Sequence, residues 1–267
     1  MGMTIAITGK GGCGKTTVSA LTVRLLVERG EGPVLAVDAD PNMNLNAALG
    51  VEVPGTVGDV REEVLDRDAS MSGGMTKTEM LEYRTAEALA EAEGFDLLAM
   101  GRPEGPGCYC YANNILRACV DRVAGNYRYV VIDCEAGLEH ISRRTTRSPD
   151  ALVALTDPSM RGLETAFRVF DLASDLDTRA RRAYLAMTMV PETGVPPALE
   201  RAIAERGLTL AATIPADEEI RRRDAMGEPL VGVSDDSPAL KAVGRLLSDV
   251  VLREPSGEES PASPPKT

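Results

Sequence analysis

A chain of 267 residues suffices for one large domain or two small ones, and a hydrophobic fraction of 43% is ordinary for a globular protein with a buried core. The net charge of −12 repels phosphate backbones and anionic lipid, so we expect neither a nucleic-acid partner nor a membrane partner. The sequence has no apolar run of about 18 residues that would span a membrane, and its N-terminus does not resemble a signal peptide. We therefore expect a cytoplasmic protein whose five cysteines are core, metal or redox residues rather than disulfides.

Short apolar runs alternate along the chain with segments of helical spacing. In chain order we predict a strand over Met3–Thr8, a helix over Thr16–Arg29, a strand over Pro33–Asp38, helices over Asn44–Leu49, Val57–Asp66 and Thr76–Ala92, a strand over Phe95–Met100, a helix over Tyr111–Ala124, strands over Tyr129–Asp133 and Ala151–Thr156, a helix over Arg161–Ser174, a strand over Ala183–Met189, a helix over Pro197–Arg206, a strand over Leu208–Ile214 and an amphipathic helix over Ser237–Leu252.

This alternation predicts the α/β class, with a mostly parallel central sheet covered by helices on both faces. No stretch of linker composition interrupts residues 1–252, so we predict one domain there. Residues 253–267 are rich in Pro, Ser and Glu, which predicts a disordered tail.

A glycine-rich segment follows the first predicted strand. It reads G-K-G-G-C-G-K-T and matches the phosphate-loop pattern G-x-x-x-x-G-K-[ST] at every fixed position. Its glycines allow backbone N–H groups to face phosphate oxygens, and the following helix adds its positive N-terminal end. Lys15 is expected to reach the β- and γ-phosphates, and Thr16 to place its hydroxyl on Mg²⁺. The predicted nucleotide-binding residues of this segment are Gly9, Lys10, Gly11, Gly12, Cys13, Gly14, Lys15, Thr16 and Thr17.

The lysine at the second position of this segment is an addition to the basic pattern. The resulting G-K-G-G-x-G-K-T resembles the deviant Walker A loop of the family that includes MinD, ParA, the arsenite-pump ATPase and the nitrogenase iron protein. In that family the extra lysine reaches the nucleotide of the partner subunit. The resemblance therefore implies a homodimer that holds ATP between its subunits, with Lys10 acting in trans. A solvated loop lysine is the alternative interpretation.

Carboxylates follow two of the predicted strands. The D-x-D-P-x-x-N-L segment that begins at Asp38 looks like the switch I of that family, where Asp40 would orient water on the γ-phosphate and Asp38 would support Mg²⁺ or the signature lysine. A capped turn is the simpler interpretation of this segment. The apolar run that ends at Asp133 has the Walker B form and predicts a Mg²⁺ ligand. Gly137 then fits switch II, where a glycine amide meets the γ-phosphate.

The residues themselves do not distinguish ATP from GTP. Members of the resembled family recognise adenine with an asparagine late in the chain, and Thr188 stands roughly at that place here. Pro215, in the segment Ile214–Asp217, is a candidate for the rest of the base pocket. A turn explains that segment equally well.

Two cysteines, Cys108 and Cys110, form a C-x-C pair between a predicted strand and a predicted helix. A pair supplies two ligands, whereas structural zinc sites have four. A twofold homodimer would bring two pairs together as four thiolates, which suit zinc, square-planar nickel or an iron–sulfur cluster. The alternative is that both cysteines are small hydrophobic residues in a tight loop.

Two longer strings narrow the resemblance. The segment G-R-P-E-G-P-G-C-Y-C from Gly101 and the segment D-C-E-A-G-L-E-H from Asp133 look like those of the CooC-type carbon monoxide dehydrogenase maturation ATPases. That group implies ATP-dependent nickel insertion into carbon monoxide dehydrogenase or acetyl-CoA synthase apoprotein, with the C-x-C pair binding Ni²⁺ or Zn²⁺ at the dimer interface.

Two other functions remain open from the sequence. A MinD- or ParA-like positioning ATPase would need a membrane helix or a basic DNA-binding face, and an ATP-gated electron donor would carry a bridging iron–sulfur cluster. Of the remaining residues, we expect Cys119 to lie in the core, Cys134 to lie inside the switch rather than on the dimer axis, and His140 to lie on a helix surface or in packing.

Overall fold

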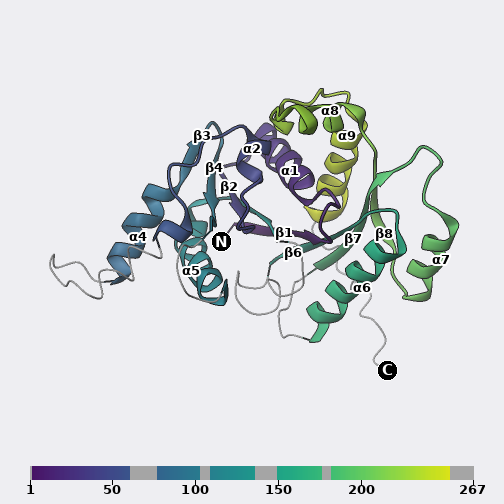
Figure 1. Cartoon of the computed structure of the whole chain (residues 1–267), viewed down its shortest axis with the longest axis horizontal. Coiled ribbons are helices and arrows are strands. Elements are labelled where there is room, and N and C mark those ends of the chain that lie inside the picture. Colours follow the sequence, from purple (N-terminus) through teal and green to yellow (C-terminus); the bar gives the residue numbers. More distant parts are fainter. Residues whose placement is uncertain (1, 61–76, 103–108, 136–148, 176–181, 253–267) are drawn as a thin grey trace.

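The computed structural model describes residues 2–60, 77–102, 109–135, 149–175 and 182–252. Its centre is an eight-stranded sheet with the order β3-β4-β2-β5-β1-β6-β7-β8 (Figure 1). All neighbouring strands are parallel except β3 and β4, which pair in antiparallel fashion. The strands are β1 (Met3–Gly9), β2 (Val34–Asp38), β3 (Ala90–Ala92), β4 (Phe95–Ala99), β5 (Tyr129–Asp133), β6 (Ala151–Thr156), β7 (Arg182–Val190) and β8 (Leu210–Pro215).

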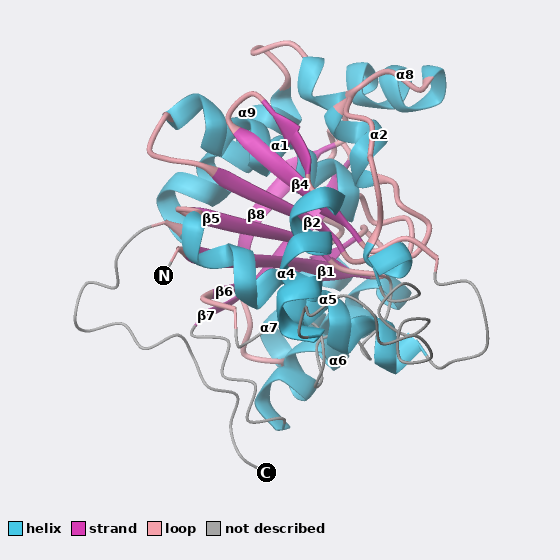
Figure 2. Ribbon diagram, turned by 90° about the vertical axis from the view of Figure 1, so that its left-hand side faces the viewer, coloured by secondary structure: helices cyan, strands magenta, loops and turns pink. Residues whose placement is uncertain are grey.

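Helices cover both faces of this sheet, as Figure 2 shows. One core cluster joins β1 and β2 to α1, α2 and α9, and the other joins the opposite face to α5, α6 and α7. The helices are α1 (Lys15–Arg29), α2 (Leu45–Leu49), α4 (Lys77–Ala88), α5 (Tyr109–Val123), α6 (Met160–Asp175), α7 (Pro197–Glu205), α8 (Glu218–Met226) and α9 (Pro238–Arg245). The predicted α/β architecture is therefore confirmed. In the described part of the chain, no helix combines the length and apolar character needed to cross a membrane.

The prediction was wrong at one edge of the sheet. The expected helix over Thr76–Ala92 ends at Ala88 in the structure, and Ala90–Ala92 forms β3 against β4. Alanine and glutamate favour a helix, but pairing with β4 overrides that weak local preference.

A second difference is α8, a helix that was not predicted. The Asp217 carboxylate caps its N-terminus by accepting hydrogen bonds from the amides of Glu219 and Ile220, and Gly227 ends it in the left-handed region. The signals for this helix were present in the sequence as an N-cap, an acidic first turn and a C-terminal glycine.

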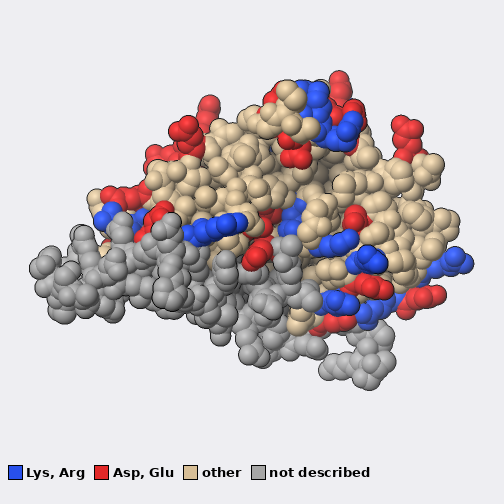
Figure 3. Space-filling view, viewed as in Figure 1, with Lys and Arg blue, Asp and Glu red and all other residues tan. Residues whose placement is uncertain are grey.

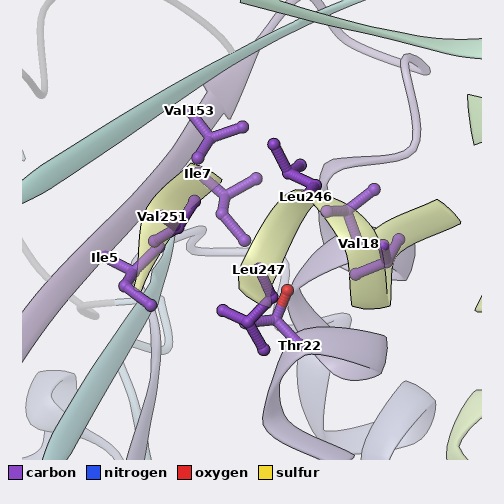
Figure 4. Close-up of a pocket in the computed structure, with 9 residues that line it drawn as sticks. Ile5, Ile7, Val18, Thr22, Val153, Leu246, Leu247 and Val251 are labelled. Carbon is purple, nitrogen blue, oxygen red and sulfur yellow. The ribbon is translucent and has the colours of Figure 1, made fainter. Parts of the chain in front are cut away.

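The predicted C-terminal amphipathic helix packs on the core. After α9, a π-helical turn (Leu246–Val251) continues the chain. Leu246, Leu247 and Val251 are buried against β1, β6 and α1, where they line a small apolar cavity of about 10 Å³ (Figure 4). A cavity of that volume has room for about one water molecule at most and lies in apolar surroundings, so it is a packing defect and not a ligand site.

We predict that Leu246→Ala lowers the free energy of unfolding by about 2–5 kcal/mol, because it removes buried methyl groups beside an existing void. Chemical denaturation measures this change. Met226→Ala is the control, since Met226 is 70% exposed and its loss should change stability by less than about 0.5 kcal/mol. Equal effects of the two substitutions would show that the C-terminal turn is not part of the core.

Candidate nucleotide site

The phosphate loop joins β1 to α1 at the carboxyl ends of the central strands, where open parallel sheets bind their ligands. Gly9 has φ +151°, and a Cβ there would overlap the Leu155 carbonyl of the neighbouring strand. Gly12 and Gly14 have open space around them but φ values of +79° and +78°, a left-handed conformation that favours glycine. The glycines thus serve two needs, close approach at Gly9 and chain reversal at Gly12 and Gly14.

The loop closes on itself before the helix begins. The Cys13 amide donates to the Lys10 carbonyl at 3.3 Å, and the Lys15 ammonium lies 3.4 Å from the same oxygen. Lys15 starts α1 and is only 9% exposed, so its charge lies within the loop. The Cys13 side chain is fully buried, and this burial raises the pKa of its thiol to about 11. Cys13 therefore contributes its backbone to the loop and its side chain to the core.

Asp133 ends β5 directly beside the loop. Its Oδ2 accepts a hydrogen bond from the Thr16 hydroxyl at 2.7 Å, and its Oδ1 accepts one from Ser19 at 3.1 Å. Burial raises the pKa of Asp133 to about 7, and the nearby charge of Asp38 raises it further against the opposing hydrogen bonds. Hydroxyl and carboxylate oxygens are the ligands that Mg²⁺ prefers, so this donor set fits the predicted Mg²⁺ site.

Asp38 lies opposite Asp133 in the pairing of β2 with β5 and is fully buried. Its two carboxylate oxygens accept hydrogen bonds from the backbone amides of Asp40, Asn44 and Leu45, at 2.9–3.0 Å. Burial raises the pKa of Asp38 to about 6, against these hydrogen bonds. In this conformation Asp38 organises the switch segment and the start of α2. The ion pair that the structure describes for Lys10 is with a different carboxylate, Asp157, and not with Asp38.

Asp40 lies in the same turn and is half-buried. Its Oδ1 accepts hydrogen bonds from the backbone and side-chain nitrogens of Asn42, and the Asn42 side-chain oxygen accepts one from Arg102 at 2.5 Å. Met43 completes the turn with φ +50°, which is unusual for a residue other than glycine. Both interpretations of the segment, a capped turn and a switch, are compatible with this geometry.

Thr188, which stands roughly where the resembled family carries its asparagine, lies buried beside the phosphate loop. It is 3% exposed, and its hydroxyl donates to the carbonyls of Cys13, at 2.8 Å, and Thr156, at 3.2 Å. It therefore supports the phosphate loop from the sheet instead of presenting a polar group to a base. Pro215 ends β8 and pairs with Val190, and the segment after it leads into the cap of α8.

Several predicted residues lie outside the described ones. These are Cys108, Gly137 and His140, while Cys110 is described only by its backbone, at the start of α5. Cys119 is fully buried, and its sulfur accepts a hydrogen bond from the Thr85 hydroxyl at 3.1 Å, which confirms its core position. Cys134 is buried, and burial raises the pKa of its thiol to about 12. Among the described residues, no group of three or more Cys, His, Asp or Glu side chains is placed to hold a metal ion.

The structure shows two residues that contact predicted site residues and that the sequence analysis missed. Ser19 lies one helical turn after Thr16 and contacts the same carboxylate, a relation that the three-residue spacing in α1 could have revealed. Asp157 follows β6 and pairs with Lys10 at 3.6 Å. The sequence feature that could have identified Asp157 is its position directly after a predicted strand. On the described surface of the face shown in Figure 3, acidic and basic side chains are interspersed, with no broad basic area in view.

Comparison with protein families agrees with this geometry. The model of the AAA_31 family, described as an AAA domain, matches residues 2–180, more than half of the chain. The chain belongs to this family. The AAA_31 assignment covers the phosphate loop, both carboxylate strands and Asp157.

Relatives of similar length align with nearly the whole of this chain. An uncharacterized ATP-binding protein of Methanocaldococcus jannaschii is 42% identical, over 94% of this chain and 100% of the relative. The carbon monoxide dehydrogenase accessory protein CooC of Rhodospirillum rubrum is 31% identical, over 94% of this chain and 96% of the relative. The solved structure of MinD from Pyrococcus horikoshii, complexed with Mg-ADP, has a TM-score of 0.67 at 26% identity. The match covers 94% of this chain and 96% of the MinD chain. The fold is thus that of the MinD/ParA P-loop NTPases.

We predict that Thr188→Val lowers the free energy of unfolding of this AAA_31 protein by about 1–3 kcal/mol, because two carbonyls that bound the hydroxyl lose a donor in a buried place. Chemical denaturation of the native protein and of the Thr188→Val variant measures the change. Thr213→Val, on the exposed side of β8, is the matched control and should be nearly neutral. A neutral Thr188→Val would mean that the hydroxyl does not hold the loop.

Proposed function

We propose that the protein is a homodimeric ATPase that binds a metal ion through Cys108 and Cys110 of both subunits and delivers nickel to carbon monoxide dehydrogenase or acetyl-CoA synthase apoprotein. The observation that carries the ATPase part is the glycine-shaped loop with Lys15 inside it and the Thr16–Asp133 pair beside it. The P. horikoshii MinD complexed with Mg-ADP supports ATP as the nucleotide.

Each residue of the site has a proposed role in hydrolysis. Water attacks the γ-phosphorus, and the bond to the bridging oxygen breaks to give ADP and phosphate. Loop amides and Lys15 hold the β- and γ-phosphates, Asp40 orients the water, the Gly137 amide meets the γ-phosphate, and Lys10 of the partner subunit offsets the charge that develops on the phosphates. Thr16 and Asp133, with Asp38 behind them, would hold Mg²⁺, which neutralises phosphate charge when bound.

The metal part of the proposal is supported by symmetry and by resemblance. A twofold dimer presents the same patch from both subunits, so C-x-C pairs that lie at the axis would meet and supply four thiolates. The 31% identical R. rubrum protein is described as a carbon monoxide dehydrogenase accessory protein, which supports a client of that class. ATP that binds only the closed dimer would bring the pairs together, and hydrolysis would release the metal ion to the client.

The packing of the last described helical turn argues against a membrane-binding role for that segment. A membrane-binding helix needs a free apolar face. Leu246, Leu247 and Val251 are 4% exposed or less, because they contact the sheet and α1.

Replacing Cys108 and Cys110 together by serine should abolish stoichiometric nickel or zinc binding and leave ATP hydrolysis measurable, because the thiolates lie outside the phosphate site in this proposal. Elemental analysis and phosphate release measure the two effects. Cys119→Ser is the control, because the buried Cys119 sulfur accepts a hydrogen bond from the Thr85 hydroxyl and should not bind metal. Unchanged metal content in the double variant would refute the metal site.

Replacing Asp40 by alanine should slow hydrolysis about a hundred- to ten-thousand-fold, the usual contribution of a group that orients or activates the nucleophile. ATP affinity and ATP-dependent dimer formation should persist, because Asp40 is not assigned to binding. Single-turnover phosphate release and equilibrium binding separate these effects. Loss of ATP binding with hydrolysis would instead identify Asp40 as a structural residue of the turn.

A further inference from the structure

The signature lysine has a partner inside its own subunit. Lys10 Nζ lies 3.6 Å from Asp157 Oδ2, and the two side chains keep 39% and 24% of their exposure. This pairing follows from the sheet, because β1 and β6 are parallel neighbours with Gly9 opposite Leu155. The residues that follow these strands therefore emerge side by side at the same edge.

The Asp157 carboxylate is fixed by its own surroundings. Its Oδ1 accepts a hydrogen bond from the Ser159 hydroxyl at 2.5 Å, and the Ser159 oxygen accepts one from the Gly162 amide at 3.1 Å. A Cβ at Gly162 would overlap Asp157 Oδ1, so this first turn of α6 accommodates the carboxylate only because residue 162 is a glycine. The acid is thus held in place, whereas the lysine reaches it with a flexible side chain.

We propose that Asp157 is a positioning residue that retains Lys10 within its own subunit, and that this ion pair breaks when Lys10 crosses to the partner's nucleotide. The inference rests on the proposed function, because it requires Lys10 to act across an ATP-bound dimer. Moving the ammonium to the phosphates of another subunit takes it away from a carboxylate that Ser159 and Gly162 keep in place. Closure of the dimer thus exchanges one anionic partner of Lys10 for another.

The size of the effect follows from the exposure of the pair. A partly exposed ion pair stabilises its conformation modestly, and two such pairs break for each dimer that forms. Weakening both pairs should therefore tighten the ATP-bound dimer about two- to thirtyfold. A subunit with ADP alone keeps Lys10 on Asp157, so its nucleotide affinity should not change.

The test compares the dissociation constant of the ATP-bound dimer with the ADP affinity of the monomer, by sedimentation and by titration calorimetry. Asp157→Asn keeps the shape and removes the charge, so it should tighten the dimer by the stated factor and leave ADP affinity unchanged. Ser159→Ala keeps the net charge and loosens the carboxylate, so it should tighten the dimer by a smaller factor. Dimer dissociation constants are compared only among variants whose melting temperature matches that of the native protein.

Asp171→Asn is the matched control. Asp171 pairs with Arg206 at 2.8 Å in a more exposed ion pair, and the substitution removes one negative charge from the subunit in the same way. If it tightens the dimer as much as Asp157→Asn does, general charge repulsion explains the effect and the proposal is wrong. An unchanged or weaker dimer in Asp157→Asn also overturns it. If the native protein forms no dimer with ATP, the proposed function itself fails, which is a separate result.

Discussion

The site depends on the tight reversal of the backbone between β1 and α1. The loop must turn its amides inward within a few residues, and only glycine permits the approach at Gly9 and the left-handed conformations at Gly12 and Gly14. Contacts from elsewhere hold that backbone, above all the buried Thr188 hydroxyl on the Cys13 carbonyl. The glycines of the loop therefore set the backbone positions of Lys10 and Lys15.

Parallel pairing then brings the acidic groups to this loop. Asp38 and Asp133 face each other at the ends of adjacent strands, and Asp157 follows β6 on the other side of β1. Burial of Asp38 and Asp133 raises both their pKa values, so the ionised pair is costly without a cation. A buried acidic pair beside a loop that collects phosphate is the arrangement that a Mg²⁺–nucleotide complex would satisfy.

The sequence predicted the sheet, its helical layers and the phosphate loop because each depends on local patterns: apolar runs, helical spacing and glycine positions. It failed where tertiary contacts decide. Ala90–Ala92 has helical composition but pairs with β4. Asp157 was missed because its partner is 147 positions away in the chain and becomes a neighbour only through the order of the strands.

The metal assignment depends on the dimer, because one C-x-C pair provides half of a four-thiolate site. The most direct measurement is the metal content of size-separated protein, loaded with nickel or zinc, with and without ATP. If the two subunits share one four-thiolate site, the protein should hold one metal ion per two chains, in the dimer fraction and only with ATP. One metal ion per chain in a monomer fraction, or a dimer without metal, would contradict it.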